Sequence, residues 1–293
     1  MTGTLADRRL AFRKRIGRRD AMILPGAGNA LTARVIADQG FDAIYVTGAG
    51  IANTYLGAPD IGLVTLTELA GTVSAIAEIT DLPLVVDIDT GFGNAINTQR
   101  TVRVIERAGA SAMQIEDQVF PKKCGHFAGK VVIPLVEAVS KIKAAVDARE
   151  DPNTLIIART DARAIHGLDA ALDRADAFIE AGADMTFVEA PTSIEEMQAI
   201  TARLSVPQVA NMVVGGKTPL IPQADLARLG FSVVLYANTP LQAAMRAMSD
   251  VLGALKADGD VSGVIDKLAD FEERQRLGAK DTYDALEARY RID

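Results

Sequence analysis

One arrangement recurs along the whole chain: a helical segment, a glycine-containing stop, a short apolar run and then a polar residue. Glycine just past a helix adopts the left-handed conformation at little cost, so each stop indicates a helix end. The apolar runs that follow are typical of parallel strands buried on both faces. The clearest stops are Gly40-Phe41-Asp42, Gly109-Ala110-Ser111, Gly182-Ala183-Asp184 and Gly230-Phe231-Ser232.

Eight such runs predict eight strands, with helical patterns such as residues 97–108 and 168–181 between them. Eight alternating units in 293 residues predict an α/β fold of the (β/α)8 TIM-barrel type. An open doubly wound sheet is the structural alternative, and the regularity of the eight units favours closure. The predicted strands are residues 21–24, 43–47, 84–87, 112–116, 155–159, 185–189, 208–211 and 232–236.

Composition limits the partners and the location of the chain. A single cysteine excludes an internal disulfide and indicates reducing surroundings. Residues 1–19 lack the apolar core of a signal peptide, and no run approaches the roughly 20 apolar residues that a membrane span requires. A net charge of −7, with no basic run longer than Lys122-Lys123, argues against nucleic acid. We therefore expect a cytoplasmic protein with no membrane or nucleic-acid partner.

Polar side chains end six consecutive predicted strands, the second to the seventh. In a barrel these ends gather at the C-terminal mouth, where such enzymes carry their active sites. Ordinary strand-terminating polar residues would explain one or two of them, but not six in succession. The mouth is therefore predicted to hold Tyr45, Thr47, Asp87, Asp89, Glu116, Arg159, Glu189 and Asn211.

The segment Asp87-Ile88-Asp89 places two carboxylates on one face of an extended chain. Paired carboxylates with few histidines suit a hard cation that prefers oxygen ligands, most plausibly Mg²⁺, with Mn²⁺ as a second choice. A solvated turn explains these two residues equally well. The presence of Glu116 at the next strand end favours the metal site.

Arg159 at a barrel mouth suits bidentate binding of a carboxylate or phosphate, and an ion pair with Glu189 or Asp161 is compatible with that role. The backbone N–H groups of Thr47, Gly48 and Ala49 are further candidates to bind a substrate carboxylate. The two Gly-Ala-Gly turns at residues 26–28 and 48–50 lack the third glycine of a dinucleotide loop, so we exclude NAD(P). They are interpreted as turns that let the backbone approach a small ligand.

The pentapeptide Lys122-Lys123-Cys124-Gly125-His126 holds the only cysteine, and its cationic neighbours favour thiolate. Such a thiol can give or take a proton near neutral pH. An isolated cysteine is usually a small buried hydrophobe, but here its neighbours are not apolar. Gly125 and Gly129 bracket a segment that is able to move over the mouth.

Together these motifs resemble the isocitrate lyase/phosphoenolpyruvate mutase superfamily. The similarity covers roughly residues 21–236, in the expected order. It rests on the pentapeptide with Glu116-Asp117-Gln118 before it, and on Tyr45-Val46-Thr47-Gly48, Asp60, Asp87-Ile88-Asp89-Thr90-Gly91-Phe92-Gly93, Ala158-Arg159-Thr160-Asp161-Ala162 and Glu189-Ala190-Pro191.

The resemblance implies Mg²⁺ near Asp87, bound mostly through water, with Asp60, Asp89 and Glu116 around it. It also implies that Thr47, Gly48 and Ala49 hold a substrate carboxylate, with Arg159 and Asn211 as further substrate contacts. Glu189, at the end of the sixth predicted strand, is a further candidate to bind substrate.

The resemblance also implies a homotetramer whose paired subunits exchange a C-terminal helix. Residues 1–240 would form the barrel, and residues 241–293, which mix apolar and charged side chains at helical spacing, would form the exchanged helices. A plain eighth helix with a frayed end is the alternative for that segment.

Within the superfamily, the cysteine marks the lyase branch, since phosphonopyruvate-forming mutases lack it. The chain length is similar to that of 2-methylisocitrate and 2,3-dimethylmalate lyases. The implied reaction breaks the C2–C3 bond of a 2-hydroxy-2-methyl di- or tricarboxylate and yields pyruvate. Mg²⁺ would stabilise the alkoxide and Cys124 would protonate the carbanion, with Lys122, Lys123 and His126 stabilising the thiolate. Tyr45, helped by Glu116 or a water, is the candidate to receive the hydroxyl proton.

The short stretch Phe127-Ala128-Gly129 after the pentapeptide favours an alkyl malate with two carboxylates over a tricarboxylate. Three alternatives remain open from the sequence. The first is an oxaloacetate hydrolase or decarboxylase, and the second is an enzyme that forms or cleaves a phosphonate. The third is a barrel that binds a metabolite without catalysis.

Overall fold

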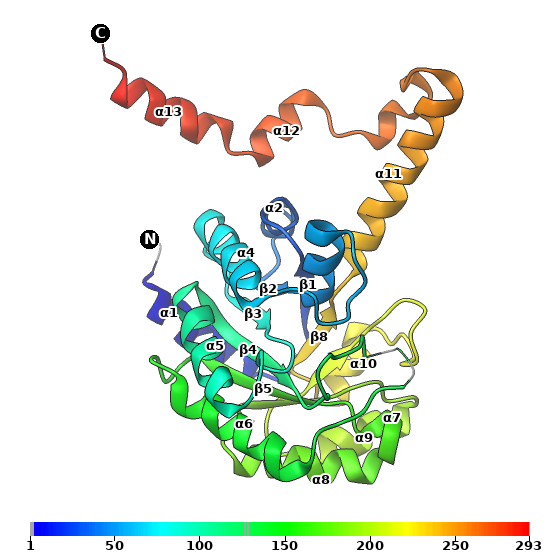
Figure 1. Cartoon of the computed structure of the whole chain (residues 1–293). Helices are drawn as coiled ribbons and strands as arrows, with labels where there is room; N and C mark the ends of the chain where they lie inside the picture. Colours follow the sequence, from blue (N-terminus) through cyan, green and yellow to red (C-terminus); the bar gives the residue numbers. More distant parts are fainter. Residues whose placement is uncertain (1–2, 126, 128, 293) are drawn as a thin grey trace.

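Eight parallel strands form a single sheet in the order β6-β5-β4-β3-β2-β1-β8-β7, which curls into a nearly closed barrel (Figure 1). The structure is a computed structural model that describes residues 3–125, 127 and 129–292. It confirms the predicted (β/α)8 fold. The strands are β1 (Met22–Ala27), β2 (Ile44–Val46), β3 (Leu84–Asp87), β4 (Ala110–Glu116), β5 (Leu155–Thr160), β6 (Met185–Val188), β7 (Val209–Asn211) and β8 (Val233–Tyr236).

Strands β6 and β7, which close the barrel, are joined by an isolated bridge and not by a continuous ladder of paired residues. A parallel bridge pairs Thr186 with Gln208, and the Thr186 hydroxyl donates to Gln208 Oε1 at 2.8 Å. The Thr186 N–H also donates to the Pro207 carbonyl at 3.2 Å. These contacts bring the ends of the two strands together, so the polar residues after β6 and β7 face the same mouth as the others.

Helices surround the barrel and alternate with its strands (Figure 1). The predicted glycine stops are confirmed, because Gly40, Gly109, Gly182 and Gly230 all have positive φ, between 76° and 118°. The helices are α1 (Leu5–Ile16), α2 (Ala30–Asp38), α3 (Gly48–Ile51), η1 (Ala52–Leu56), α4 (Leu66–Ile79), α5 (Ala95–Arg107), α6 (Leu135–Ala148), α7 (Arg163–His166), α8 (Leu168–Glu180), α9 (Ile194–Arg203), α10 (Gln223–Arg228), α11 (Thr239–Asp258), η2 (Ser262–Lys267), α12 (Phe271–Leu277) and α13 (Lys280–Tyr290).

The first strand is longer than the sequence indicates. Residues 21–24 were expected, but β1 continues through Pro25 and Gly26 to Ala27. The reason is a change of partner: residues 22–25 align with β8, and residues 26–27 align with β2. Two residues that normally interrupt a strand are therefore accommodated where the strand passes from one neighbour to the other.

Helix α1 closes the N-terminal end of the barrel, a role that the sequence analysis did not predict. Its Phe12 and Ile16 join a buried cluster with side chains from inside the barrel such as Tyr45 and Phe187. Its Arg9 is also buried and donates to the carbonyls of Glu106 and Ala110, at 2.8 and 3.0 Å. The barrel interior is thus sealed at the end opposite the predicted site.

The C-terminal helices leave the barrel (Figure 1). Helix α11 follows β8 and runs outward from Thr239, and none of the residues of α11, α12 or α13 is buried. Helix α12 meets α2 through an ion pair between Arg276 and Asp38. Among the described residues, no helix combines the length and the apolar character needed to cross a membrane.

Candidate active site

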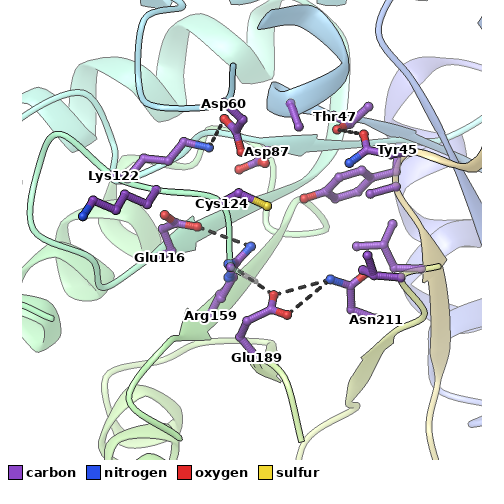
Figure 2. Close-up of a pocket in the computed structure, with 17 residues that line it drawn as sticks. Tyr45, Thr47, Asp60, Asp87, Glu116, Lys122, Cys124, Arg159, Glu189 and Asn211 are labelled. Atoms are coloured by element: carbon purple, nitrogen blue, oxygen red, sulfur yellow. Dashed lines mark hydrogen bonds and ion pairs between the residues drawn. The ribbon is translucent and has the colours of Figure 1, made fainter. Parts of the chain in front are cut away.

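The C-terminal mouth of the barrel holds a pocket that opens to solvent (Figure 2). Most of the predicted site residues line it, namely Tyr45, Thr47, Ala49, Asp60, Asp87, Glu116, Lys122, Cys124, Arg159, Glu189 and Asn211. Gly48 and Asp89 adjoin these residues, and the prediction for His126 lies outside the described residues.

Lys122 is almost completely buried, and its ammonium forms ion pairs with Asp60 and with Asp89, the latter at 2.8 Å. Burial lowers the pKa of Lys122, but Asp89, Glu116, Asp87 and Asp60 outweigh it, so the net pKa lies well above its ordinary value. The ammonium therefore stays charged. Lys122, which is predicted to stabilise the thiolate, is thus also paired with carboxylates of the predicted metal site.

Asp87 and Asp89 converge on one point beside Gly48. Asp87 Oδ2 and Asp89 Oδ1 each lie 3.3 Å from the position that a Cβ on Gly48 would occupy. Burial raises the pKa of Asp89 to about 7, against the opposing effect of Lys122 and with a further rise from Asp87. Buried Glu116 Oε1 has no hydrogen-bond partner among the described residues. Crowded, desolvated carboxylate oxygens of this kind fit a hard divalent cation.

Arg159 lies between three carboxylates, of which Figure 2 shows those of Glu116 and Glu189. Its guanidinium forms ion pairs with Glu116 at 3.4 Å, with Asp161 at 3.0 Å and with Glu189 at 3.2 Å. Burial lowers the pKa of Arg159, but the neighbouring carboxylates raise it well above its ordinary value, so the charge is fixed. Both ion pairs that the sequence suggested are present, and Asn211 Nδ2 extends the network to Glu189 at 3.4 Å.

A second layer of charged residues supports Arg159 from behind. Asp117 is buried and accepts hydrogen bonds from the Asp161 N–H at 2.9 Å, from the Thr160 hydroxyl at 2.6 Å and from Arg174 at 2.8 Å. Burial raises the pKa of Asp117, and Arg174 opposes that rise. This layer fixes Asp161, and Asp161 in turn orients the guanidinium.

Cys124 is half-buried, and its sulfur points into the pocket toward the Tyr45 hydroxyl (Figure 2). Gly125 next to it approaches the strand ends so closely that a Cβ there would lie 2.4 Å from Arg159 Nη2 and 2.8 Å from Glu189 Cδ. The thiol is thus held over the same pocket as the carboxylates and the guanidinium.

Tyr45 lies on β2 and Thr47 follows it directly, and the hydroxyl of each forms a hydrogen bond within the protein. The Tyr45 hydroxyl donates to Gln114 Oε1 at 3.0 Å, and Thr47 Oγ1 caps α3 by accepting from the Gly50 N–H at 3.2 Å. Burial, followed by the negative charge of Asp87, raises the pKa of Tyr45 well above its ordinary value. The phenol is therefore protonated near neutral pH.

Several residues of the site were not singled out from the sequence. Gln114 lies within an apolar strand, and Lys130 lies in a polar loop, so neither has a local signal of its role. The pocket also has an apolar side, formed by residues after β7 and in or just after β8. In the sequence these residues cannot be distinguished from ordinary core residues. That side consists of Val213, Leu235 and Ala237, with Asn238 beside them.

Comparison with known proteins identifies similar chains. The family model described as phosphoenolpyruvate phosphomutase matches residues 12–256. A 2,3-dimethylmalate lyase of Eubacterium barkeri is 46% identical over 262 residues, covering 89% of this chain and 91% of that protein. A 2-methylisocitrate lyase of Aeropyrum pernix is 46% identical over 259 residues, covering 88% of this chain and 83% of that protein.

A solved structure agrees with these sequence matches. The crystal structure of a 2,3-dimethylmalate lyase, described as a PEP mutase/isocitrate lyase superfamily member, superposes with a TM-score of 0.91. The two chains are 35% identical, and the match covers 96% of this chain and 94% of the other. The similarity therefore includes the barrel and much of the C-terminal segment.

Proposed function

The chain belongs to the phosphoenolpyruvate mutase/isocitrate lyase superfamily, and we propose that it is a carbon–carbon lyase acting on a 2-hydroxy-2-methyl di- or tricarboxylate. Substrates of the 2,3-dimethylmalate or 2-methylisocitrate type would yield pyruvate and a second carboxylate. The observation that carries this proposal is the pocket in which Cys124 faces Arg159 and a group of buried carboxylates. The 46% identity to two lyases supports the same reaction class.

Asp87, Asp89 and Glu116 are the residues that would hold Mg²⁺, with Asp60 nearby. Among the described residues, no three acidic, histidine or cysteine side chains are already arranged to chelate one ion, so binding would depend largely on water. When bound, the ion would stabilise negative charge on the substrate hydroxyl oxygen.

The side chains of this chain then divide the remaining work. Arg159 and Asn211 would bind and orient a substrate carboxylate, since both line the pocket and are held by Glu189. Tyr45 is protonated and would donate a hydrogen bond, which leaves Glu116 as the acceptor of the hydroxyl proton. Burial raises the pKa of Glu116 well above its ordinary value, against the opposing charge of Arg159, and its Oε1 has no hydrogen-bond partner among the described residues.

Cleavage requires a proton at the carbon that leaves. As the C2–C3 bond breaks, C2 becomes the keto carbon of pyruvate and the electron pair moves to C3, where the adjacent carboxylate delocalises it. Cys124 Sγ–H would give its proton to C3 and become a thiolate. The apolar side formed by Val213, Leu235 and Ala237 would accommodate the methyl groups of the substrate.

The test is a panel of 2,3-dimethylmalate, 2-methylisocitrate, isocitrate and oxaloacetate, assayed for keto-acid release with Mg²⁺. We expect pyruvate from one or both of the first two, loss of activity with EDTA and recovery on adding Mg²⁺. Oxalate and acetate from oxaloacetate alone would favour a hydrolase. A new phosphorus NMR signal from phosphoenolpyruvate would favour a phosphonate enzyme, and no turnover of any compound would contradict catalysis.

The C-terminal helices support the proposal that the chain assembles as a homotetramer that exchanges residues 241–293. They project from the barrel and expose large apolar side chains, and such surfaces normally lie in interfaces. The exposed residues include Met248, Leu252, Ile265, Phe271, Tyr283 and Tyr290.

Sedimentation is expected to give a species of about 124 kDa, four times the 31.0 kDa chain. Phe271→Asp, at a side chain that is 70% exposed, should shift the protein toward smaller species, because a carboxylate cannot be buried in an apolar interface without cost. Glu272→Ala at the neighbouring exposed position is the control and should assemble normally. A monomeric wild-type chain would contradict the exchange.

A further inference from the structure

The loop between β4 and α6 carries Cys124 and is fastened at its base. Gln118 and Val132 form an antiparallel bridge, and the Val119 N–H donates to the Val131 carbonyl at 2.8 Å. These contacts hold the two ends of the loop together. They do not by themselves fix the backbone next to the thiol.

The backbone on either side of Cys124 is held by a side chain. Before it, Gln118 accepts from the Lys123 N–H at 3.0 Å and donates to the Lys123 carbonyl at 2.7 Å. After it, the Lys130 ammonium donates to the Gly125 carbonyl. The thiol-bearing residue is therefore fixed between two clamps.

The Lys130 clamp also reaches the substrate-binding strand end. Lys130 is 7% exposed, and its Nζ lies 2.5 Å from Asp161 Oδ1. Asp161 is completely buried and binds both Nε and Nη2 of Arg159, at 3.0 and 3.2 Å. One ammonium thus links the backbone beside Cys124 to the carboxylate that orients Arg159.

Close packing makes this link sensitive to small displacements. Gly125 packs against Arg159 and Glu189 with no room for a Cβ, so the Lys130 contact keeps this part of the loop close to the strand ends. Without the Lys130 ammonium, Asp161 would keep its ion pair with Arg159 and the hydrogen bond from its N–H to Asp117. The Gly125 carbonyl would lose its charged donor.

We propose that Lys130 is a positioning residue that places the Cys124 thiol over the reacting carbon, by tying the Gly125 carbonyl to Asp161. This rests on the proposed function, in which Cys124 is the proton donor. The alternative is that Lys130 only balances the buried charge of Asp161. A residue that only balances charge would affect stability when replaced, but not the access of reagents to the thiol.

The single cysteine allows a test that does not depend on the substrate. Cys124 is alkylated in separate reactions with N-ethylmaleimide and the bulkier N-(1-pyrenyl)maleimide, both uncharged, and the ratio of the two rates is taken. Because both reagents attack the same thiolate, its ionisation cancels from the ratio. Since a half-buried thiol discriminates by access, we expect Lys130→Met to raise the bulky-to-small rate ratio about tenfold. Lys143→Met on the exposed face of α6 removes a charge elsewhere and should leave the ratio unchanged.

Activity gives the second measurement. Misplacing a catalytic group by about 1 Å costs on the order of 10²-fold, so Lys130→Met should lower kcat about 10²-fold with little change in KM. Lys130→Arg, which keeps the charge and the donors, should recover part of kcat and restore the rate ratio.

A folded Lys130→Met with the wild-type rate ratio would overturn the proposal, whatever its activity. If Lys130→Met does not fold, Lys130→Ala, which also lacks a donor to the Gly125 carbonyl, is measured in the same way and decides by the same ratio. Failure of the proposed function is distinguishable. It would appear as a wild-type protein without turnover on the substrate panel, while the alkylation ratios would still differ.

Discussion

Replacing Cys124 with serine is expected to lower kcat for carbon–carbon cleavage by about 10²- to 10⁴-fold, the usual contribution of a general acid. The serine hydroxyl fits the space of the thiol, but its proton is far less acidic. It therefore cannot protonate C3 efficiently as the C2–C3 bond of the substrate breaks. Because Arg159 and Asn211 remain in place, KM should change little. Steady-state kinetics with the best substrate of the panel would measure both values.

Two controls belong to this experiment. Circular dichroism and the melting temperature should match the wild type, because Cys124 is half-buried in a loop and not in the core. Calorimetric binding of pyruvate should also be retained. A folded Cys124→Ser that cleaves its substrate at the wild-type rate would remove the thiol from the mechanism and leave only its position in the pocket.

Gly26→Ala is expected to have the largest effect on stability. Gly26 lies in β1, and a Cβ there would be 1.8 Å from the carbonyl oxygen of Ala237, just after β8. Because the added Cβ would meet backbone atoms of Ala237, no flexible side chain can move aside. Strands β1 and β8 would therefore have to separate locally. Overpacking commonly costs about 1–3 kcal/mol, and here we expect at least the upper end of that range.

Gly71→Ala is the matched control for this variant. Gly71 lies in α4, and a Cβ there would meet nothing within 4 Å. Alanine is the better helix former by about 0.5–1 kcal/mol, so this variant should be as stable as the wild type or more so. Urea unfolding of the two variants checks both expectations. A Gly26→Ala protein with the wild-type midpoint would show that the seam relaxes without cost.

Much of the fold was predictable because its signals are local. Each strand is a short apolar run and each helix end a glycine, and both depend on neighbouring residues only. The same holds for the polar residues after the strands, such as Asp87 and Arg159, whose position at the mouth follows once the barrel closes. Helix α1 was missed because only Arg9, Phe12 and Ile16 of its residues are buried, in an otherwise basic segment.

The partners of the charged residues were less predictable. Lys122 was expected to stabilise the thiolate, and its further ion pair with Asp60, 62 positions away, was not predicted. Lys130 had no predicted role, and its contact with Asp161 spans 31 positions. Nothing in the residues near a lysine specifies which of several carboxylates will face it, because that choice depends on how the loops pack.

The sequence by itself determined the eight units, the barrel and the set of polar residues at its mouth. The tertiary structure alone decided how those residues are used. The glycine turns illustrate the difference: the sequence indicated close approach of the backbone, and we interpreted the approaching group as a ligand. In the structure Gly26 faces the Ala237 carbonyl, and Gly28 faces Gly50. The physical reason is that a glycine indicates only that a neighbouring group leaves no room for a side chain. Which group that is depends on a distant part of the chain.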